Sequence, residues 1–215
     1  MTGAPGWPEL HVPAASGRPA LILRPWRRAD IRALATEMSH DYLLGGMWSG
    51  LEERPFRGRG TRQGGLPDPA GDEREAARWI ASQNRGWRDG DRLCFAVRAP
   101  DDAGGWVLAG NVGLKNRDET GRIGARETAE IGYWTAVAVR GRGIAPAAVI
   151  AVTGWVFEEF AGSSLRQIML VHDVANPASC RVAHKAGYLF RELSPANPPH
   201  WLTDGHIHMR HLRLT

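Results

Sequence analysis

The sequence predicts an α/β fold in which a mixed sheet carries helices on both of its faces. Three strand-like runs follow one another at hairpin spacing, over residues 92–98, 106–114 and 128–139. Beyond residue 140 the pattern changes, and helical and strand-like segments alternate. A meander of antiparallel strands followed by such an alternation predicts a mixed sheet.

The chain is expected to begin with a strap, a strand and a helix. Residues 1–18 are rich in Gly, Pro and Ala without periodicity, so we expect a loose N-terminal strap ahead of one domain over residues 19–215. The apolar run 21–26 predicts a first strand. Asp30 is placed to cap a helix over 31–38, where apolar residues recur at helical spacing.

A long loop separates this first helix from the next. Residues 45–71 are rich in Gly, Pro and Arg and are too long for a routine connection, which predicts a functional or mobile loop. A helix over 72–86 then leads into the meander. After the meander we expect a glycine-rich turn at 140–143, a helix over 144–160, a strand over 167–172, a helix over 177–186 and strands near 187–193 and 206–214.

The composition is that of a globular protein. Of the 215 residues 43% are hydrophobic and 23% are charged, which excludes a disordered chain. The sequence has no apolar run long enough to span a bilayer and no basic and apolar leader at its start, so we expect a cytoplasmic protein without a membrane partner. Two cysteines, Cys94 and Cys180, are too few for a disulfide framework and fit a reducing compartment.

The formal net charge of +4 comes almost entirely from arginine. Only two of the 27 basic residues are lysines, which a GC-rich genome would explain. Arginine also recognises phosphate well. The basic residues are scattered among acidic neighbours rather than gathered on one segment, so a phosphate-bearing ligand is compatible with the sequence and a nucleic-acid partner is not expected.

The segment 136–145, AVAVRGRGIA, carries the most specific signal. An apolar strand enters a turn with two glycines, and a helix begins at once. Glycine lets the main chain approach a phosphate closely, and a helix N-terminus adds partial positive charge. The turn therefore predicts a pyrophosphate site, with a purely structural tight turn as the alternative. The GxxxxGK[ST] of a P-loop is absent, and a dinucleotide-binding GxGxxG would belong to an N-terminal βαβ unit.

The stretch RGRGIA at 140–145 resembles the Gln/Arg-x-x-Gly-x-Gly/Ala signature of the GNAT superfamily of N-acetyltransferases. Three further stretches agree with it in order and spacing: LRPW at 23–26 with Asp30 after it, AEIGYW at 129–134, and NPAS at 176–179 followed by KAGY at 185–188. These variants are most similar to the branch that includes ribosomal-protein alanine acetyltransferases. The resemblance covers about residues 20–212.

The resemblance implies a mostly antiparallel sheet of about seven strands, splayed between strands 4 and 5, with acetyl-CoA in the gap. In this family the main chain holds the pantetheine like an added strand, the glycine-rich turn binds the pyrophosphate, and Asn and Ser at the next helix contact the pantetheine arm and the thioester sulfur. The cofactor-binding set implied here is Val137, Ala138, Val139, Arg140, Gly141, Arg142, Gly143, Ile144, Ala145, Asn176, Ser179 and Lys185.

Direct transfer to an amine needs a base for the amine and an acid for the departing thiolate. The resemblance implies Glu130 as the base, directly or through water, with a salt-bridged strand glutamate as the alternative. Many relatives use a helix tyrosine as the acid, but this sequence has Ala183 there. Ser179 is expected to contact the sulfur instead, and Tyr188 is either a further acid or a core residue. The N–H of Val139 or a neighbour is the expected oxyanion donor.

The acceptor is expected to be a protein or peptide N-terminus or a small amine such as an antibiotic or polyamine. A non-catalytic acyl-CoA-binding module is the third interpretation. Trp48, His172 and Trp201 are candidate acceptor-binding residues. The sequence leaves a monomer and a homodimer open.

No metal site is expected from the sequence. His206 and His208 share one face of the last strand and His211 points to the other, with no acidic or cysteine partner nearby in the chain. Cys180 is expected to pack in its helix, because no His-Asp pair arranges it as a nucleophile.

Overall fold

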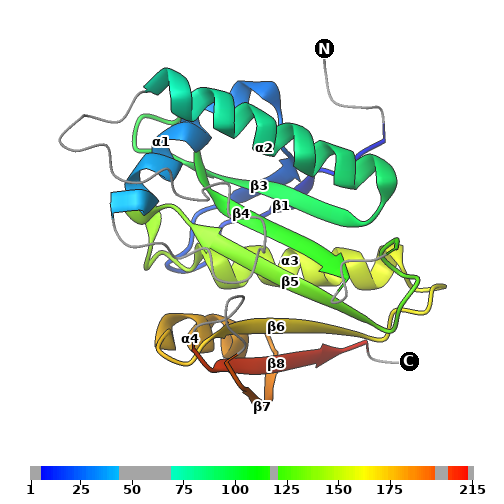
Figure 1. Ribbon diagram of the computed structural model, residues 1–215. Helices are drawn as coiled ribbons and strands as arrows, with labels where there is room; N and C mark the ends of the chain where they lie inside the picture. The colour runs from blue at the N-terminus through cyan, green and yellow to red at the C-terminus, as the bar shows by residue number, and fades with distance from the viewer. Residues whose placement is uncertain (1–5, 44–68, 117–120, 197–202, 213–215) are drawn as a thin grey trace.

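The computed structural model describes residues 6–43, 69–116, 121–196 and 203–212. In this part of the chain eight strands form one sheet in the order β1-β2-β3-β4-β5-β6-β8-β7 (Figure 1). The strands are β1 Leu10–Val12, β2 Leu21–Pro25, β3 Arg92–Pro100, β4 Trp106–Asn116, β5 Thr128–Thr135, β6 Gln167–Asp173, β7 Leu189–Ser194 and β8 Gly205–His211. The helices are α1 Ile31–Leu43, α2 Pro69–Asp89, α3 Ile144–Glu159 and α4 Pro177–Lys185, with 3-10 turns at Arg28–Asp30 and Val137–Val139.

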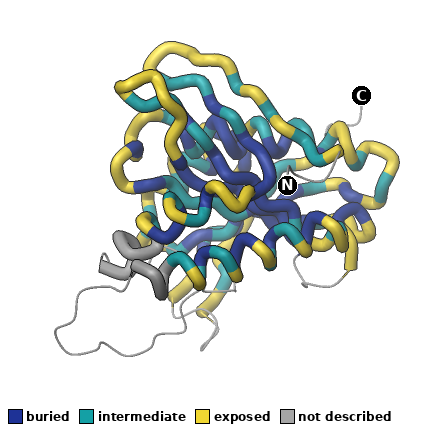
Figure 2. Tube along the Cα trace, turned by 90° about the horizontal axis from the view of Figure 1, so that it is seen from above, coloured by how far each residue is buried: buried dark blue, intermediate teal, exposed yellow. Residues whose placement is uncertain are grey.

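Helices cover both faces of the sheet, as predicted. In Figure 1, α1 and α2 lie over one face, and α3 crosses behind the other, with α4 beside β6 and β8. Each face has its own buried cluster. Trp26, Trp79 and Cys94 belong to the cluster under α1 and α2, whereas Phe95 and Val152 belong to the larger cluster under α3. Figure 2 shows the buried residues as a dark band along the sheet, flanked by helices with an exposed outer side.

The sheet is antiparallel except where β5 meets β6. These two strands pair in parallel over only three residue pairs, the last of which joins Glu130 to Met169. Beyond this pair β5 continues to Thr135 and β6 to Asp173, but the two strands no longer pair with each other. The predicted splay between the fourth and fifth expected strands is therefore confirmed, and it lies between β5 and β6.

Two segments differ from the sequence expectation. Residues 10–12, within the segment expected to be a loose strap, pair antiparallel with β2 as strand β1, which makes eight strands instead of about seven. Residues 137–139, expected to end a strand, form a 3-10 turn in which the N–H of Val139 donates to Ala136 O at 3.1 Å. The apolar pattern is typical of a strand, but β6 stopped pairing with β5 at Glu130, so the N–H of Val139 is satisfied locally.

Asp30 is the centre of a buried ion pair. It was expected to cap the first helix, but its carboxylate instead accepts the N–H of Arg27, the N-cap of the 3-10 turn before α1, at 2.8 Å. It also accepts two hydrogen bonds from Arg24, at 2.7 and 2.8 Å, and one from Arg98 at 3.1 Å. Burial opposes the charge, yet these donors lower the pKa of Asp30 overall. Arg24 on β2 and Arg98 on β3 are thereby both connected to Asp30, directly before α1.

Among the described residues, no helix is both long and apolar enough to cross a membrane.

Candidate active site

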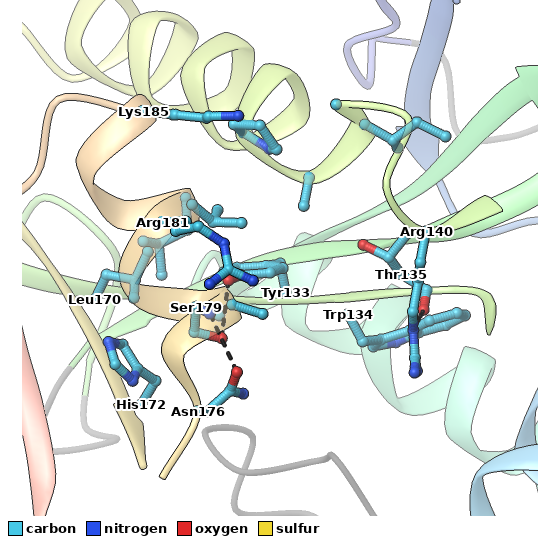
Figure 3. Close-up of a pocket in the computed structure, with 18 of the residues that line it drawn as sticks. Tyr133, Trp134, Thr135, Arg140, Leu170, His172, Asn176, Ser179, Arg181 and Lys185 are labelled. Carbon is cyan, nitrogen blue, oxygen red and sulfur yellow. Dashed lines mark hydrogen bonds between the residues drawn. The ribbon is translucent and has the colours of Figure 1, made fainter. Parts of the chain in front are cut away.

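A pocket opens where β5 and β6 separate. Strand β5 forms one wall, the turn before α3 and the first residues of α3 form the top, and β6 with α4 forms the other wall (Figure 3). The residues that line it are Ile131, Gly132, Tyr133, Trp134, Thr135, Val139, Arg140, Gly141, Gly143, Ile144, Ala145, Pro146, Leu170, Val171, His172, Asn176, Ala178, Ser179, Arg181, Val182 and Lys185.

The glycine-rich turn has the geometry that anion binding requires. Gly141 and Gly143 have φ of +78° and +70°, the left-handed region that glycine adopts at little cost. Gly143 is the N-cap of α3, so the first N–H groups of that helix lie at the pocket. Arg140, Arg181 and Lys185 add basic side chains to the lining. A diphosphate ligand would therefore meet both main-chain donors and positive charge.

Three expected cofactor contacts do not line this pocket, Arg142 and two residues of the 137–139 segment. Val137 and Ala138 do not line it, and Val137 is 41% exposed. Val139 lines the pocket, but its N–H is already donated to Ala136 O. Because the strand ends at Thr135, residues 137–139 form a 3-10 turn and not the extended edge that the sequence predicted. Their contact with the cofactor stays a prediction.

The free edge of β5 lies a few residues earlier. Ala136 donates its N–H to Ala109 O on β4. Main-chain groups alternate along a strand, so the N–H groups of Tyr133 and Thr135 point the other way, into the gap toward β6. Thr135 O already faces this side, where it accepts a hydrogen bond from Arg140 Nε at 3.1 Å.

A row of three polar side chains links β5 to the start of α4. Asn176 is the N-cap of α4, and its Oδ1 accepts the N–H of Ser179 at 3.1 Å. The Tyr133 hydroxyl donates to Ser179 Oγ at 3.0 Å (Figure 3). Burial raises the pKa of Tyr133, while the bond to Ser179 opposes this shift. Tyr133 thus keeps its proton at neutral pH and faces the pocket with Ser179.

Sequence reasoning missed Tyr133 because it looked for the tyrosine on the helix. Ala183, at the helix position, is fully buried. Tyr188 is also buried, and its hydroxyl lies 2.7 Å from Thr153 Oγ1. Burial raises the pKa of Tyr188 far above its usual range, and the residue does not line the pocket. The alternation of β5 could have placed Tyr133 on the face toward α4, had strand and helix been known to meet there.

Glu130 lies beside the pocket rather than in it. It is opposite Lys115 on β4, and its Oε1 is 3.9 Å from Lys115 Nζ. Both residues are buried. Ala129 and Ile131 belong to the cluster under α3, so Glu130 points to the α1–α2 face of the sheet. Its role as the base stays a prediction.

The remaining residues that the sequence analysis singled out lie partly in the pocket and partly outside it or outside the described residues. Ile144, Ala145 and Lys185 line the pocket, whereas Arg142 does not. Trp48 and Trp201 lie outside the described residues, as does most of the loop 45–71.

His172 lines the pocket and also belongs to a cluster that the sequence did not predict. Strand pairing brings His172 on β6 opposite His206 on β8, and Cys180 on α4 packs against the same face. The expectation that the last-strand histidines have no cysteine partner took account only of neighbours along the chain.

Comparison with known proteins identifies a family and similar solved structures. Residues 20–189 match the family described as Acetyltransferase (GNAT) domain. No curated protein matches the sequence. Among solved structures, Mycobacterium smegmatis RimJ in complex with CoA-disulfide has 20% identity and a TM-score of 0.69, with 95% of this chain and 86% of that chain covered.

Two further solved structures share the fold. RimL, a ribosomal-protein alpha-N-acetyltransferase in complex with coenzyme A, has 15% identity and a TM-score of 0.64, covering 94% of this chain and 98% of its own. The microcin C7 self-immunity acetyltransferase MccE, in complex with acetyl-CoA and AMP, has 15% identity and a TM-score of 0.63, covering 89% and 92%.

Proposed function

Because the chain belongs to the GNAT acetyltransferase family, we propose that it transfers the acetyl group of acetyl-CoA to a primary amine by direct attack. The observation that carries this proposal is the pocket between β5 and β6, where the anion-binding turn and the Tyr133–Ser179–Asn176 row face each other. A nucleotide diphosphate at one end and a thioester at the other end fit this distribution of charge and hydroxyl groups.

The donor would lie along the open edge of β5. Main-chain N–H groups at the start of α3, with Arg140 and Lys185, would hold its phosphates. The pantetheine arm would pair with the edge of β5 at Tyr133 and Thr135, in place of the 137–139 segment. Asn176, whose Oδ1 caps α4, has its amide nitrogen left to donate to a pantetheine carbonyl.

The reaction joins the amine nitrogen to the thioester carbonyl carbon and breaks the carbon–sulfur bond. The N–H of Tyr133 or Thr135 would stabilise the negative charge that develops on the carbonyl oxygen, an interaction worth about 3 kcal/mol in acyl transfer. Ser179 accepts a hydrogen bond from Tyr133 and keeps its own proton to donate toward the sulfur. Tyr133 can then replace that proton, so the pair supplies the acid that Ala183 cannot.

The amine loses a proton as the new bond forms, and we assign its removal to Glu130. Since Glu130 points to the α1–α2 face and does not line the cofactor pocket, an intervening water would carry the proton to it. This assignment also sets the direction of approach, because the acceptor would then reach the thioester through the gap from the face opposite α3. Replacement Glu130→Gln with undiminished kcat would exclude it.

The acceptor class is the part of the proposal that most needs an experiment. RimJ and RimL lead us to test peptide N-termini first, and MccE leads us to include small amines. The assay measures thiol release from acetyl-CoA over free peptides, the same peptides with blocked N-termini, polyamines and aminoglycosides. We expect release with free peptides and none with blocked ones. Coenzyme A binding without turnover on any amine would instead indicate a non-catalytic acyl-CoA-binding module.

A further inference from the structure

Four side chains with metal-ligating atoms converge beside the pocket from three separate elements. They are His172 on β6, Cys180 on α4, and His206 and His208 on β8, and one ligand atom from each lies within 4.8 Å of all the others. His172 Nε2 is 3.2 Å from His208 Nε2. Cys180 Sγ is 3.2 Å from His206 Nδ1 and 4.0 Å from His208 Nε2.

These distances are close to those of a tetrahedral metal site. Zinc binds imidazole nitrogen at about 2.0–2.1 Å and thiolate sulfur at about 2.3 Å, so neighbouring ligand atoms lie about 3.3–3.6 Å apart. The His172–His208 separation of 3.2 Å is close to the nitrogen–nitrogen distance of about 3.3 Å. Cys180 Sγ lies 3.2 Å from His206 Nδ1 and 4.0 Å from His208 Nε2, on either side of the nitrogen–sulfur distance of about 3.6 Å, so shifts of a few tenths of an ångström would seat an ion between the four side chains. Three imidazoles and one thiol are a donor set that suits zinc and its neighbours, not magnesium or calcium.

The protonation of the cluster is suited to binding a cation. His172 Nδ1 lies 2.8 Å from Asp173 O, and a carbonyl can only accept, so Nδ1 carries the proton and Nε2 presents its lone pair to the cluster. Within the described residues, the buried His208 Nδ1 has no partner of ordinary hydrogen-bond geometry, although the main chain of Tyr188 is close to the ring.

We propose that His172, Cys180, His206 and His208 bind one divalent cation of the zinc class. All four positions are filled by protein, so the site is closed and would have a structural role rather than activate water. It would fasten the first turn of α4 to β6 and β8, and the residue before Cys180 is Ser179 of the pocket. The chemistry of acetyl transfer requires no metal, so the metal site does not depend on the proposed function, although His172 also lines the pocket.

The test is a metal titration of the full chain, freed of any affinity tag, stripped with chelator and kept reduced. We expect one equivalent of Co²⁺ to give the intense visible absorption of four-coordinate cobalt together with a thiolate charge-transfer band, and one equivalent of Zn²⁺ to displace it. Bound Zn²⁺ should also raise Tm and slow alkylation of Cys180 by iodoacetamide.

Variants on the same elements identify the ligands. Cys180→Ser should remove the charge-transfer band and weaken binding at least about tenfold, the lower end of the effect that loss of even an outer partner has on a metal site. His206→Gln serves as a second ligand variant if circular dichroism shows that Cys180→Ser fails to fold. His184→Gln on α4 and His211→Gln on β8 are matched controls, because both residues are exposed and lie outside the cluster.

Any of four results would overturn the proposal. The first three are the absence of one-to-one Co²⁺ binding, a spectrum without the thiolate band, and equal loss of binding in the ligand variants and the controls. Rapid alkylation of Cys180 that Zn²⁺ does not slow would indicate a Cys180–His206 pair that acts as a free thiol, and would also refute the metal site.

Discussion

Replacement of Tyr133 by Phe is the sharpest test of the proposed acid. The change removes one hydroxyl, whose bond to Ser179 Oγ is 3.0 Å long, and leaves the ring on β5. General acid catalysis contributes about 10²–10⁴ in rate. Because Ser179 can still donate its own proton once, we expect the lower end, a fall in kcat of about 10²-fold, or about 2.7 kcal/mol in the barrier. Coenzyme A affinity should stay unchanged.

Tyr188→Phe is the matched control. Its hydroxyl also makes a single contact with another hydroxyl, Thr153 Oγ1 at 2.7 Å, but it lies in the core away from the pocket. This variant should lose about 1–3 kcal/mol of unfolding free energy, the cost of a buried group left without a partner, and keep its kcat. The measurements are thiol release with the acceptor that the panel returns, calorimetry with coenzyme A, and urea unfolding.

The two tyrosine variants must differ in kcat if the Tyr133–Ser179 pair is the acid. If Tyr133→Phe retains kcat within about twofold, or if both variants lose rate equally, the Tyr133–Ser179 pair is not the acid. The pKa of Tyr133 adds a second check. Since burial raises it above the usual value of 10.0, the acid form persists as pH rises, and kcat should not fall on the alkaline side until above that value.

Three further predictions concern the turn, the buried ion pair and the histidines. Gly143→Asp should weaken coenzyme A binding by tenfold or more, because the new carboxylate would repel the phosphates. Gly104→Asp is the control, since Gly104 has a similar positive φ in an exposed turn, and calorimetry should show unchanged coenzyme A binding. Asp30→Asn should cost about 3–5 kcal/mol of unfolding free energy because Arg24 stays buried without its partner, whereas Glu73→Gln in the exposed pair with Arg32 should cost less than about 1 kcal/mol by urea unfolding. The folded-state pKa values of His172 and His208 lie below the ordinary 6.5, so the unfolded chain takes up more protons below that pH. The stability of the metal-free protein should therefore fall as pH drops through 6.5, and a flat profile by urea unfolding between pH 7 and 5 would contradict the burial of these rings.

The local signals in the sequence were sufficient for the order of the elements from β2 onward and for the glycine-rich turn, but not for β1. Gly141 and Gly143 ahead of an apolar helix predict a glycine-rich turn at a helix N-terminus, and the structure has one, in which both glycines have a positive φ. The reason is that φ above zero and N-capping depend on one or two residues. Periodicity likewise placed α3, α4 and the meander close to their observed bounds.

The sequence did not show where two neighbouring strands stop pairing. Residues 137–139 have a strand pattern, yet they form a 3-10 turn because β6 no longer accompanies β5 there. The partner of Tyr133 lies 46 positions along the chain, on α4. Neither the end of a sheet pairing nor a contact across that separation has a signature in local composition.

The sequence by itself determined the family, the α/β class and the glycine-rich turn at the start of α3, because these follow from short-range patterns of residue type. Only the tertiary structure decided which main-chain edge faces the gap, which tyrosine reaches Ser179, and that Cys180 meets three histidines. Strand pairing and helix docking set those contacts, and both are fixed by burial of apolar faces far apart in the chain. The cluster of His172, Cys180, His206 and His208 is therefore a property of the fold that no single segment of this sequence carries.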